Sequence, residues 1–139
     1  MTKKKVYISA RFNEKEEVIR IAKVLEKWDY KVISDWIYHK PIKPYGKNQE
    51  LSKEYSIDDI NNSTQSDYFI LLTSEGGTGM YVELGSAIEH CVKDGKPEIY
   101  VIGNHLDRCM FYFHPVVKRM KNIEDLIIKL QIANIDNKK

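Results

Sequence analysis

The residues best suited to chemistry lie in one glycine-rich segment. Residues 74–79 read Ser-Glu-Gly-Gly-Thr-Gly and join an apolar run to a helical pattern. They form no Walker loop, and Val82 replaces the third glycine of a Gly-x-Gly-x-x-Gly motif. Glycines here let a ligand approach the backbone N–H groups at the positive end of a helix. We therefore predict an anion or sugar cradle with Gly77, Thr78 and Gly79 as binding residues, the alternative being a plain strand-to-helix turn.

Glu83 is the candidate reactive group beside this cradle. We expect a helix from about residue 81 to 92, which puts Glu83 in its first turn. There the helix dipole favours an ionised carboxylate by ~0.3–1 kcal/mol. Gly85 and Ala87 leave open space around the side chain. An ionised, partly shielded glutamate is the form that attacks a sugar carbon, whereas many acids at this position only start a helix.

Further candidate site residues lie in two places: directly after the apolar run at 6–10, and in the segment before the apolar run at 68–73. Ser9 and Arg11 come directly after an apolar run, and an arginine fork binds phosphate oxygens in bidentate fashion. The alternative is a surface arginine paired with a nearby glutamate. Asp58, Asp59 and Asp67 are acids of which at least one is expected to approach the same crevice. The spacing of these acids does not decide whether Asp58 or Asp59 faces the crevice.

Other side chains suggest base stacking but no metal. His105, Cys109 and His114 match no zinc-ligand spacing, so we predict no metal and no cofactor. Aromatic residues able to stack on a base, most of them also suited to the core, are Tyr7, Trp36, Tyr38, Tyr81 and Tyr112.

Bulk composition limits the class of protein. The chain has 139 residues and 42% hydrophobic residues, enough for one domain spanning 1–139. The 22 basic and 20 acidic residues nearly cancel, which argues against a nucleic-acid polymer as partner. We find no signal peptide and no membrane-spanning run, and the two cysteines lack disulfide-scaffold spacing. A cytoplasmic location is expected.

The hydrophobic pattern predicts the elements that position these residues. Apolar runs at 6–10, 30–34, 68–73, 99–102 and 116–120 indicate strands. Helical patterns cover 18–28, about 49–66, about 81–92 and 123–130, with Asn13 and Glu16 resembling a capping box, 35–48 forming a loop and 134–139 a polar tail. This alternation predicts an α/β, flavodoxin/Rossmann-like fold with a five-stranded, mostly parallel sheet and helices on both faces. Ligands then bind at the carboxyl edge, between the loops after the first and third strands.

The motifs occur in a familiar order. They are Val-Tyr-Ile-Ser at 6–9, Asp59 and Asp67 before a buried strand, Gly-Thr-Gly-Met-Tyr-Val-Glu-Leu-Gly-Ser-Ala at 77–87, and Gly-Lys-Pro at 95–97. This arrangement resembles the nucleoside 2-deoxyribosyltransferase superfamily, which includes the deoxynucleoside 5′-monophosphate N-glycosidases. The resemblance covers roughly residues 6–102.

The resemblance implies cleavage or transfer at the N-glycosidic bond of a nucleoside 5′-monophosphate or nucleoside. Glu83 matches the carboxylate that attacks the anomeric carbon in a retaining double displacement. Asp59 matches an aspartate that assists the base, and Tyr7 a tyrosine that orients the nucleophile. Ser9 and Arg11 resemble a Ser-x-Arg that holds the 5′-phosphate. A homodimer or higher homo-oligomer is also implied, with the polar helix around Asp59 as a candidate face.

The chain also departs from that pattern. Gly77 stands where transferases tend to have Asp and the nucleotide hydrolases Ser, and two extra residues at Met80-Tyr81 would make Thr78 the equivalent. A basic, tyrosine-rich loop containing Trp36 differs from either branch. Two alternatives therefore stay open: a TIR-like enzyme that cleaves NAD, and a non-catalytic nucleotide sensor or decoy.

Overall fold

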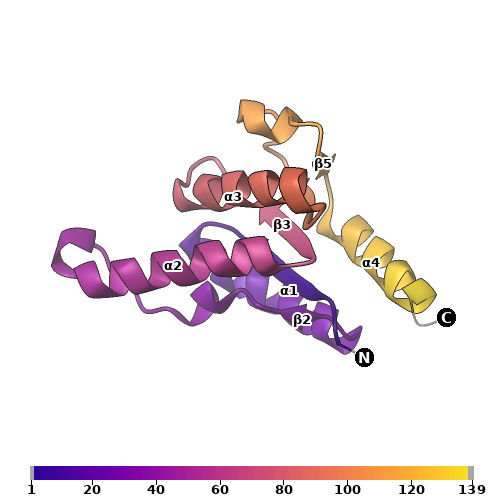
Figure 1. The fold of residues 1–139 in the computed structure, drawn as a ribbon, viewed down its shortest axis with the longest axis horizontal. Helices are drawn as coiled ribbons and strands as arrows, with labels where there is room; N and C mark the ends of the chain where they lie inside the picture. The colour runs from indigo at the N-terminus through magenta and orange to yellow at the C-terminus, as the bar shows by residue number, and fades with distance from the viewer. Residues whose placement is uncertain (1, 138–139) are drawn as a thin grey trace.

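A parallel sheet forms the centre of the computed structural model, which describes residues 2–137. Within this range five strands pair in the order β2-β1-β3-β4-β5 (Figure 1). They are β1 Lys5–Ser9, β2 Lys31–Val32, β3 Tyr68–Leu72, β4 Glu98–Ile102 and β5 Val117–Met120. Every pairing is parallel. The predicted α/β, flavodoxin-like fold class and strand order are confirmed.

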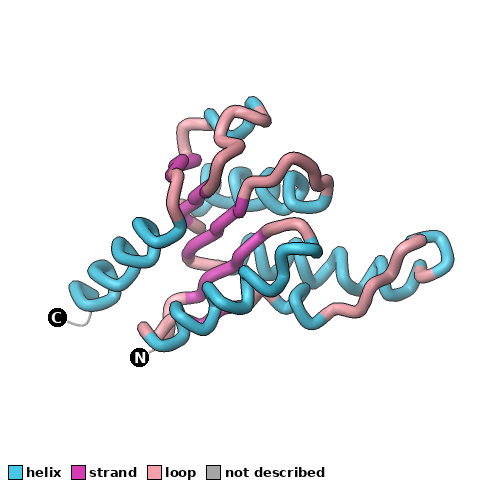
Figure 2. The backbone as a smooth tube through the Cα atoms, turned by 180° about the vertical axis from the view of Figure 1, so that it is seen from behind, coloured by secondary structure: helices cyan, strands magenta, loops and turns pink. Residues whose placement is uncertain are grey.

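Helices cover both faces of this sheet. Within residues 2–137 the α-helices are α1 Lys15–Lys27, α2 Gln49–Gln65, α3 Gly79–Asp94 and α4 Ile123–Asn137. Helices α2 and α3 pack together on the face seen in Figure 1, and α1 lies in front in the reverse view of Figure 2. Helix α4 contacts the end of α1, where Asn134 Nδ2 of α4 donates to the carbonyl of Trp28, the residue that follows α1. Short 3-10 helices occupy Phe12–Glu14 (η1), Asp35–Tyr38 (η2), Tyr45–Lys47 (η3) and Met110–Phe113 (η4).

The neighbouring strands β1 and β3 lie within the core. Every residue of β3 is buried, as expected for a strand covered on both faces. Tyr7 of β1 stacks on Phe69 of β3 with ring centroids 5.8 Å apart. No helix within residues 2–137 has both the length and the apolar character needed to cross a membrane.

Two side chains complete the outer edge of β1, where β2 is too short to pair with it. The Ile8 N–H donates to Ser34 Oγ at 2.6 Å, and Trp36 Nε1 donates to the Ile8 carbonyl at 2.7 Å. Both partners are buried, so they satisfy the two main-chain groups that β2 leaves open. The Ser-Asp-Trp sequence at 34–36 thereby fixes the backbone immediately before Ser9.

Several predicted helix ends were wrong. Residues 12–14 form η1, so α1 begins at Lys15 and neither Asn13 nor Glu16 makes a capping box. Helix α3 begins at Gly79, two residues before the predicted start, because buried Met80 draws its first turn into the core. The predicted tail at 134–139 belongs to α4 as far as Asn137, and residues 138–139 lie outside the described range.

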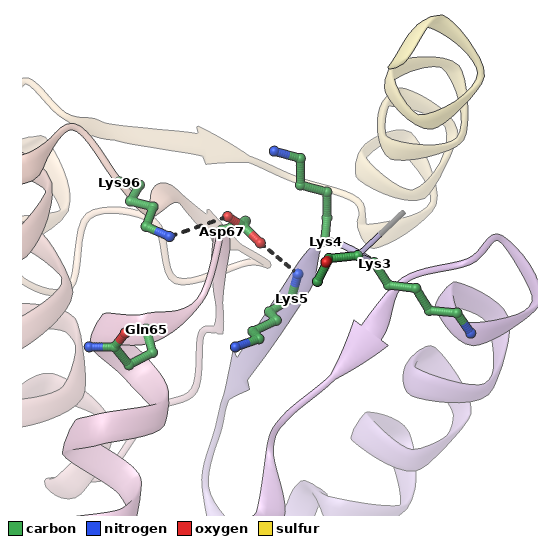
Figure 3. Close-up of a pocket in the computed structure, with 7 residues that line it drawn as sticks. Lys3, Lys4, Lys5, Gln65, Asp67 and Lys96 are labelled. Atoms are coloured by element: carbon green, nitrogen blue, oxygen red, sulfur yellow. Dashed lines mark hydrogen bonds and ion pairs between the residues drawn. The ribbon is translucent and has the colours of Figure 1, made fainter. Parts of the chain in front are cut away.

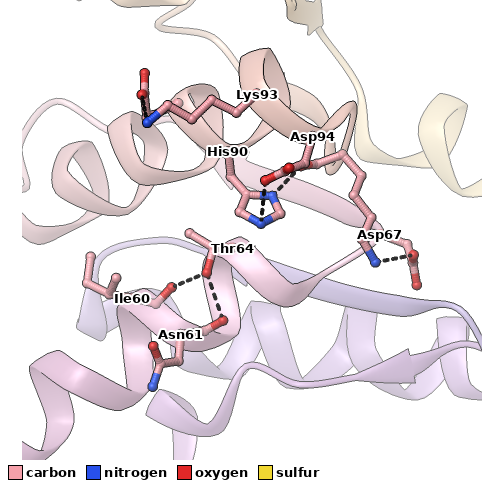
Figure 4. Close-up of polar contacts among 9 residues, drawn as sticks. Ile60, Asn61, Thr64, Asp67, His90, Lys93 and Asp94 are labelled. Atoms are coloured by element: carbon pink, nitrogen blue, oxygen red, sulfur yellow. Dashed lines mark hydrogen bonds and ion pairs between the residues drawn. The ribbon is translucent and has the colours of Figure 1, made fainter.

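Polar contacts close the end of α3 (Figure 4). Gly95 adopts a φ of +84°, the left-handed conformation that commonly ends a helix. His90 Nδ1 donates to the Lys96 carbonyl at 2.6 Å, and its Nε2 lies 3.3 Å from Asp94 Oδ2. These contacts set where β4 can begin, and they lie at the opposite end of α3 from the glycine-rich turn.

Candidate active site

The loops after β1 and β3 meet at the carboxyl edge of the sheet, where ligands were expected. Arg11 Nη1 lies 3.5 Å from Ser74 Oγ and donates to it. The guanidinium lies over the glycine-rich turn, since a Cβ built on Gly76 would be 3.4 Å from Arg11 Cζ. The structure therefore brings the exposed Arg11 side chain together with the predicted cradle.

The turn itself requires a glycine at Gly77. Its φ is +99°, and an added Cβ would lie 3.1 Å from Met80 Sδ and 3.2 Å from Arg11 Cγ. Thr78 precedes α3 without capping it through its side chain, and a Cβ on Gly79 would meet nothing within 4 Å. The Thr78 side chain therefore does not cap the start of α3, where a helix can bind an anion through its first N–H groups.

Glu83 lies on α3 and faces the end of β1. Ser9 Oγ donates to Glu83 Oε1 at 2.6 Å, and Ser9 itself is fully buried. Because α3 starts at Gly79, Glu83 lies in the second helical turn, and the prediction of a first-turn position was wrong. The helix dipole falls off within one turn, so the Ser9 hydroxyl is the closer source of stabilisation for the carboxylate.

Tyr7 lies beneath this pair. Its side chain is fully buried, and the hydroxyl makes no hydrogen bond of ordinary geometry although Glu83, Asp59 and Ser63 surround it. Burial, followed by the charges of Glu83 and Asp59, raises the pKa of Tyr7 well above its usual value. The tyrosine therefore stays neutral and keeps a proton available to an acceptor in the site.

Asp59 is the acid of α2 that reaches the crevice. Its Oδ1 atom is buried without a hydrogen-bond partner, whereas Asp58 is exposed. Burial, with smaller contributions from Asp58 and Asp35, raises the pKa of Asp59 to about 6. A buried polar atom without a partner is uncommon and marks a place where a ligand group can bind.

The Glu83 carboxyl is the most strongly shifted acid of the site. Its pKa is raised to about 7, chiefly by burial and also by the charge of Asp59, although the contacts with Ser9 and Tyr7 act to lower it. Two acids with raised pKa values at one edge of a sheet are typical of catalytic sites, although ion-pair networks also produce such shifts.

Other predicted residues lie elsewhere or in different surroundings. Trp36 is 6% exposed and bonded to Ile8, so it presents no open stacking face. Asp67 lies at the amino edge of the sheet, where its carboxylate accepts from the Lys5 N–H at 2.8 Å and lies 3.6 Å from Lys96 Nζ (Figure 3). Asp67 is thus separate from the crevice. The stacked pair Tyr81 and Tyr112, 6.1 Å apart, packs α3 against η4.

Ser63 was not among the predicted site residues. Its Oγ donates to the Asp59 carbonyl at 2.6 Å, and it lies next to the Tyr7 hydroxyl. The sequence could have indicated Ser63 as a site residue, because it lies four positions after Asp59 and therefore on the same face of the helix. Among residues 2–137 no group of three His, Cys, Asp or Glu side chains could hold a metal ion.

Comparisons with known proteins address the fold. No family model and no curated protein matches the sequence. Among solved structures, the CMP N-glycosidase BcmB of Clostridium botulinum superposes with a TM-score of 0.62 and 16% sequence identity. The match covers 94% of this chain and 99% of that chain. This chain therefore has the fold of a nucleotide N-glycosidase, the enzyme class to which the sequence motifs pointed.

Proposed function

We propose that this protein cleaves the N-glycosidic bond of a nucleoside 5′-monophosphate through a glycosyl ester on Glu83. The observation that carries the proposal is the Glu83 carboxylate, held at 2.6 Å by the buried Ser9 hydroxyl at the carboxyl edge of the sheet. The shared fold with a CMP N-glycosidase supports the same class of reaction. Sites of this fold class bind ligands at that edge.

In the first step the ionised Glu83 carboxylate attacks the anomeric carbon. A new C–O bond forms while the bond from that carbon to the base nitrogen breaks, and the electron pair leaves with the base. The Ser9 hydroxyl holds one carboxylate oxygen, which leaves the other free to attack. Asp59, whose pKa is raised to about 6, keeps its proton in a larger fraction of molecules near neutral pH than an ordinary aspartate does, and it gives that proton to the departing base.

In the second step water attacks the same carbon and releases the sugar phosphate. The C–O bond of the ester breaks, and its electron pair returns to the Glu83 carboxylate. The proton that water loses passes to the Asp59 carboxylate, which gave its own proton to the base in the first step. Two displacements at one carbon give net retention of configuration. The neutral Tyr7 hydroxyl lies beside Glu83 and stabilises the charge that builds up on its oxygens as the ester breaks.

The 5′-phosphate binds beside the Arg11 guanidinium, at the start of α3. Arg11 carries a fixed positive charge, and its guanidinium lies against Gly76. The first N–H groups of α3 follow directly. A dianionic phosphate there receives charge-assisted hydrogen bonds that a free nucleoside lacks, so nucleotides are the better substrates.

The experiment is a base-release assay on purified protein. Nucleoside 5′-monophosphates with each base, the matching nucleosides and NAD are incubated with wild type, Glu83→Gln and Glu89→Gln. Glu89 is the matched control, since it lies on α3 and pairs with exposed Lys93 at 2.9 Å. We expect release from a monophosphate by wild type and Glu89→Gln, and a loss of roughly a thousandfold or more in Glu83→Gln.

Four results would contradict the proposal. Release from no monophosphate would exclude the reaction, and intact nucleotide recovered after tight binding would favour a sensor. Nicotinamide release from NAD alone would favour the TIR-like alternative. Undiminished release by Glu83→Gln would exclude Glu83 as the nucleophile.

A further inference from the structure

Ser63 places a hydroxyl at the buried position of a surface helix. Within α2, all of whose residues the structure describes, Ser63 alone is buried, with an exposed fraction of 0%. Buried helix positions usually carry apolar side chains, and alanine, which is nearly the same size, is the better helix former. The hydroxyl at this position therefore calls for a reason beyond packing.

The Ser63 hydroxyl has its proton committed and its oxygen available. Oγ donates to the Asp59 carbonyl, four residues earlier on α2, at 2.6 Å. A hydroxyl has one donor hydrogen and two acceptor lone pairs. While this bond is made, Ser63 can therefore act towards a second partner only as an acceptor. The group beside it is the hydroxyl of Tyr7 on β1.

The Tyr7 hydroxyl needs an acceptor. It is fully buried and makes no hydrogen bond of ordinary geometry, and a buried O–H without an acceptor is costly. It remains a donor, because its pKa lies well above the usual value. The acids that face it are Glu83 from α3 and Asp59 from α2, of which Asp59 acts through its charge alone. Glu83 and Ser63 are thus the two acceptors within its reach.

We propose that Ser63 is a positioning residue that accepts the Tyr7 O–H whenever Glu83 is uncharged, and that the O–H turns to Glu83 when the carboxylate is ionised. An ionised carboxylate is the stronger acceptor, so it takes the hydrogen bond when it is present. In the free protein the uncharged state is protonated Glu83. In turnover it is the glycosyl ester, and this part rests on the function proposed above. The phenol keeps its proton in every state.

This arrangement links Ser63 to Glu83 through a single group. With Ser63 as the alternative acceptor, the Tyr7 O–H is not left unpaired when Glu83 is protonated or esterified. Ser63 therefore stabilises the uncharged states of Glu83 relative to the ionised state. It does so only while Tyr7 has a hydroxyl, whereas a serine that merely packs α2 against the sheet would act independently of that hydroxyl.

Carbon-13 NMR titration of the Glu83 carboxyl in the full chain tests the proposal. Ser63→Ala removes the alternative acceptor, so the pKa of Glu83 falls from about 7 by roughly 0.5–1. In a Tyr7→Phe background the same substitution leaves that pKa unchanged, since no O–H remains to be held. The matched control is Thr64→Ala, because Thr64 Oγ1 also bonds to a carbonyl four residues earlier, that of Ile60 at 3.1 Å (Figure 4). It points about 100° away round the helix axis and leaves the pKa unchanged.

Two results would overturn the proposal. One is a pKa of Glu83 that stays constant or rises in Ser63→Ala; the other is an equal fall with and without Tyr7→Phe, which would show a packing effect. Thermal melting checks the fold of each variant. Ser63→Cys gives a second substitution, whose weaker sulfur acceptor predicts a smaller fall of the same pKa. The titration needs no substrate, so an inactive protein with the expected titration would reject the proposed function and still support the assignment of Ser63.

Discussion

Ser9 Oγ and Glu83 Oε1 are 2.6 Å apart although their residues are 74 positions apart in the chain. The bond joins the end of β1 to α3, and so links the two loops that form the crevice. Ser9 is fully buried, and its backbone follows Ile8, whose main-chain groups are held by Ser34 and Trp36. The orientation of the carboxylate thus depends on the edge of the sheet.

Removing this hydrogen bond changes the titration of Glu83. A bond to the ionised form lowers a carboxyl pKa, so Ser9→Ala raises the pKa of Glu83 further above about 7. The limb of the kcat/KM profile near pH 7, which reports Glu83, moves to higher pH with it, and the maximal rate falls because less Glu83 is ionised while Asp59 is protonated. Carbon-13 NMR of the glutamate carboxyls measures the shift without relying on activity. Ser86→Ala, which removes a hydroxyl bonded to the Val82 carbonyl on the same helix, leaves the titration unchanged.

Glu83→Gln is expected to stabilise the fold while abolishing activity. The carboxyl has an ordinary pKa of 4.5 when unfolded and about 7 when folded, so wild type loses stability as pH rises through that interval. Glu83→Gln has no carboxyl to ionise at this position, so it does not lose stability over that pH interval. Its stability advantage is absent below pH 4.5 and reaches about 3 kcal/mol above pH 7. Urea unfolding at several pH values measures it, and an advantage that does not grow with pH would contradict the shifted pKa.

Asp59→Asn removes the falling limb of the pH profile. If Asp59 must be protonated and Glu83 ionised, kcat/KM follows a bell with apparent pKa values near 6 and 7 that belong to the pair. The asparagine variant keeps only a rising limb, which is set by the pKa of Glu83, and that pKa falls below about 7 because the Asp59 charge that raises it is gone. Its rate falls by roughly a hundredfold. Asp58→Asn is the exposed control, and an equal loss in both variants would contradict the assignment.

Gly77→Ala tests the geometry of the turn. Its φ of +99° and the nearby Met80 and Arg11 atoms predict a destabilisation of ~1–3 kcal/mol. They also predict a higher KM for the nucleotide, because Arg11 must move. Gly79→Ala has open space and a helical position, so its stability stays at or slightly above that of wild type. Thermal unfolding of both variants distinguishes them, and equal melting temperatures would show that the turn tolerates a side chain.

The sheet was predictable from sequence because β3 and β4 are continuous apolar runs flanked by turn residues. The glycine-rich turn and Glu83 were also predictable, because they directly follow the apolar run of β3 in the sequence. The start of α3 was not, because glycine is a poor helix former and only the burial of Met80 places the first turn at Gly79. Packing against the core outweighs local propensity at that position.

The choice between Asp58 and Asp59 depends on how α2 is rotated about its axis. That helix carries little apolar patterning and buries only Ser63 among its residues, so the sequence gives no face to orient it. The role of Trp36 was hidden for a related reason. An indole N–H that bonds to a strand carbonyl leaves no mark in the spacing of residues, since the bond to Ile8 joins segments 28 positions apart.

Peptide mass analysis of enzyme quenched during turnover of a nucleoside 5′-monophosphate shows whether Glu83 is the nucleophile. We expect a sugar-phosphate ester on the peptide that contains Glu83, absent in Glu83→Gln and present in Glu89→Gln. A sugar phosphate attached to any other residue, or an adduct that survives in Glu83→Gln, would contradict that role of Glu83.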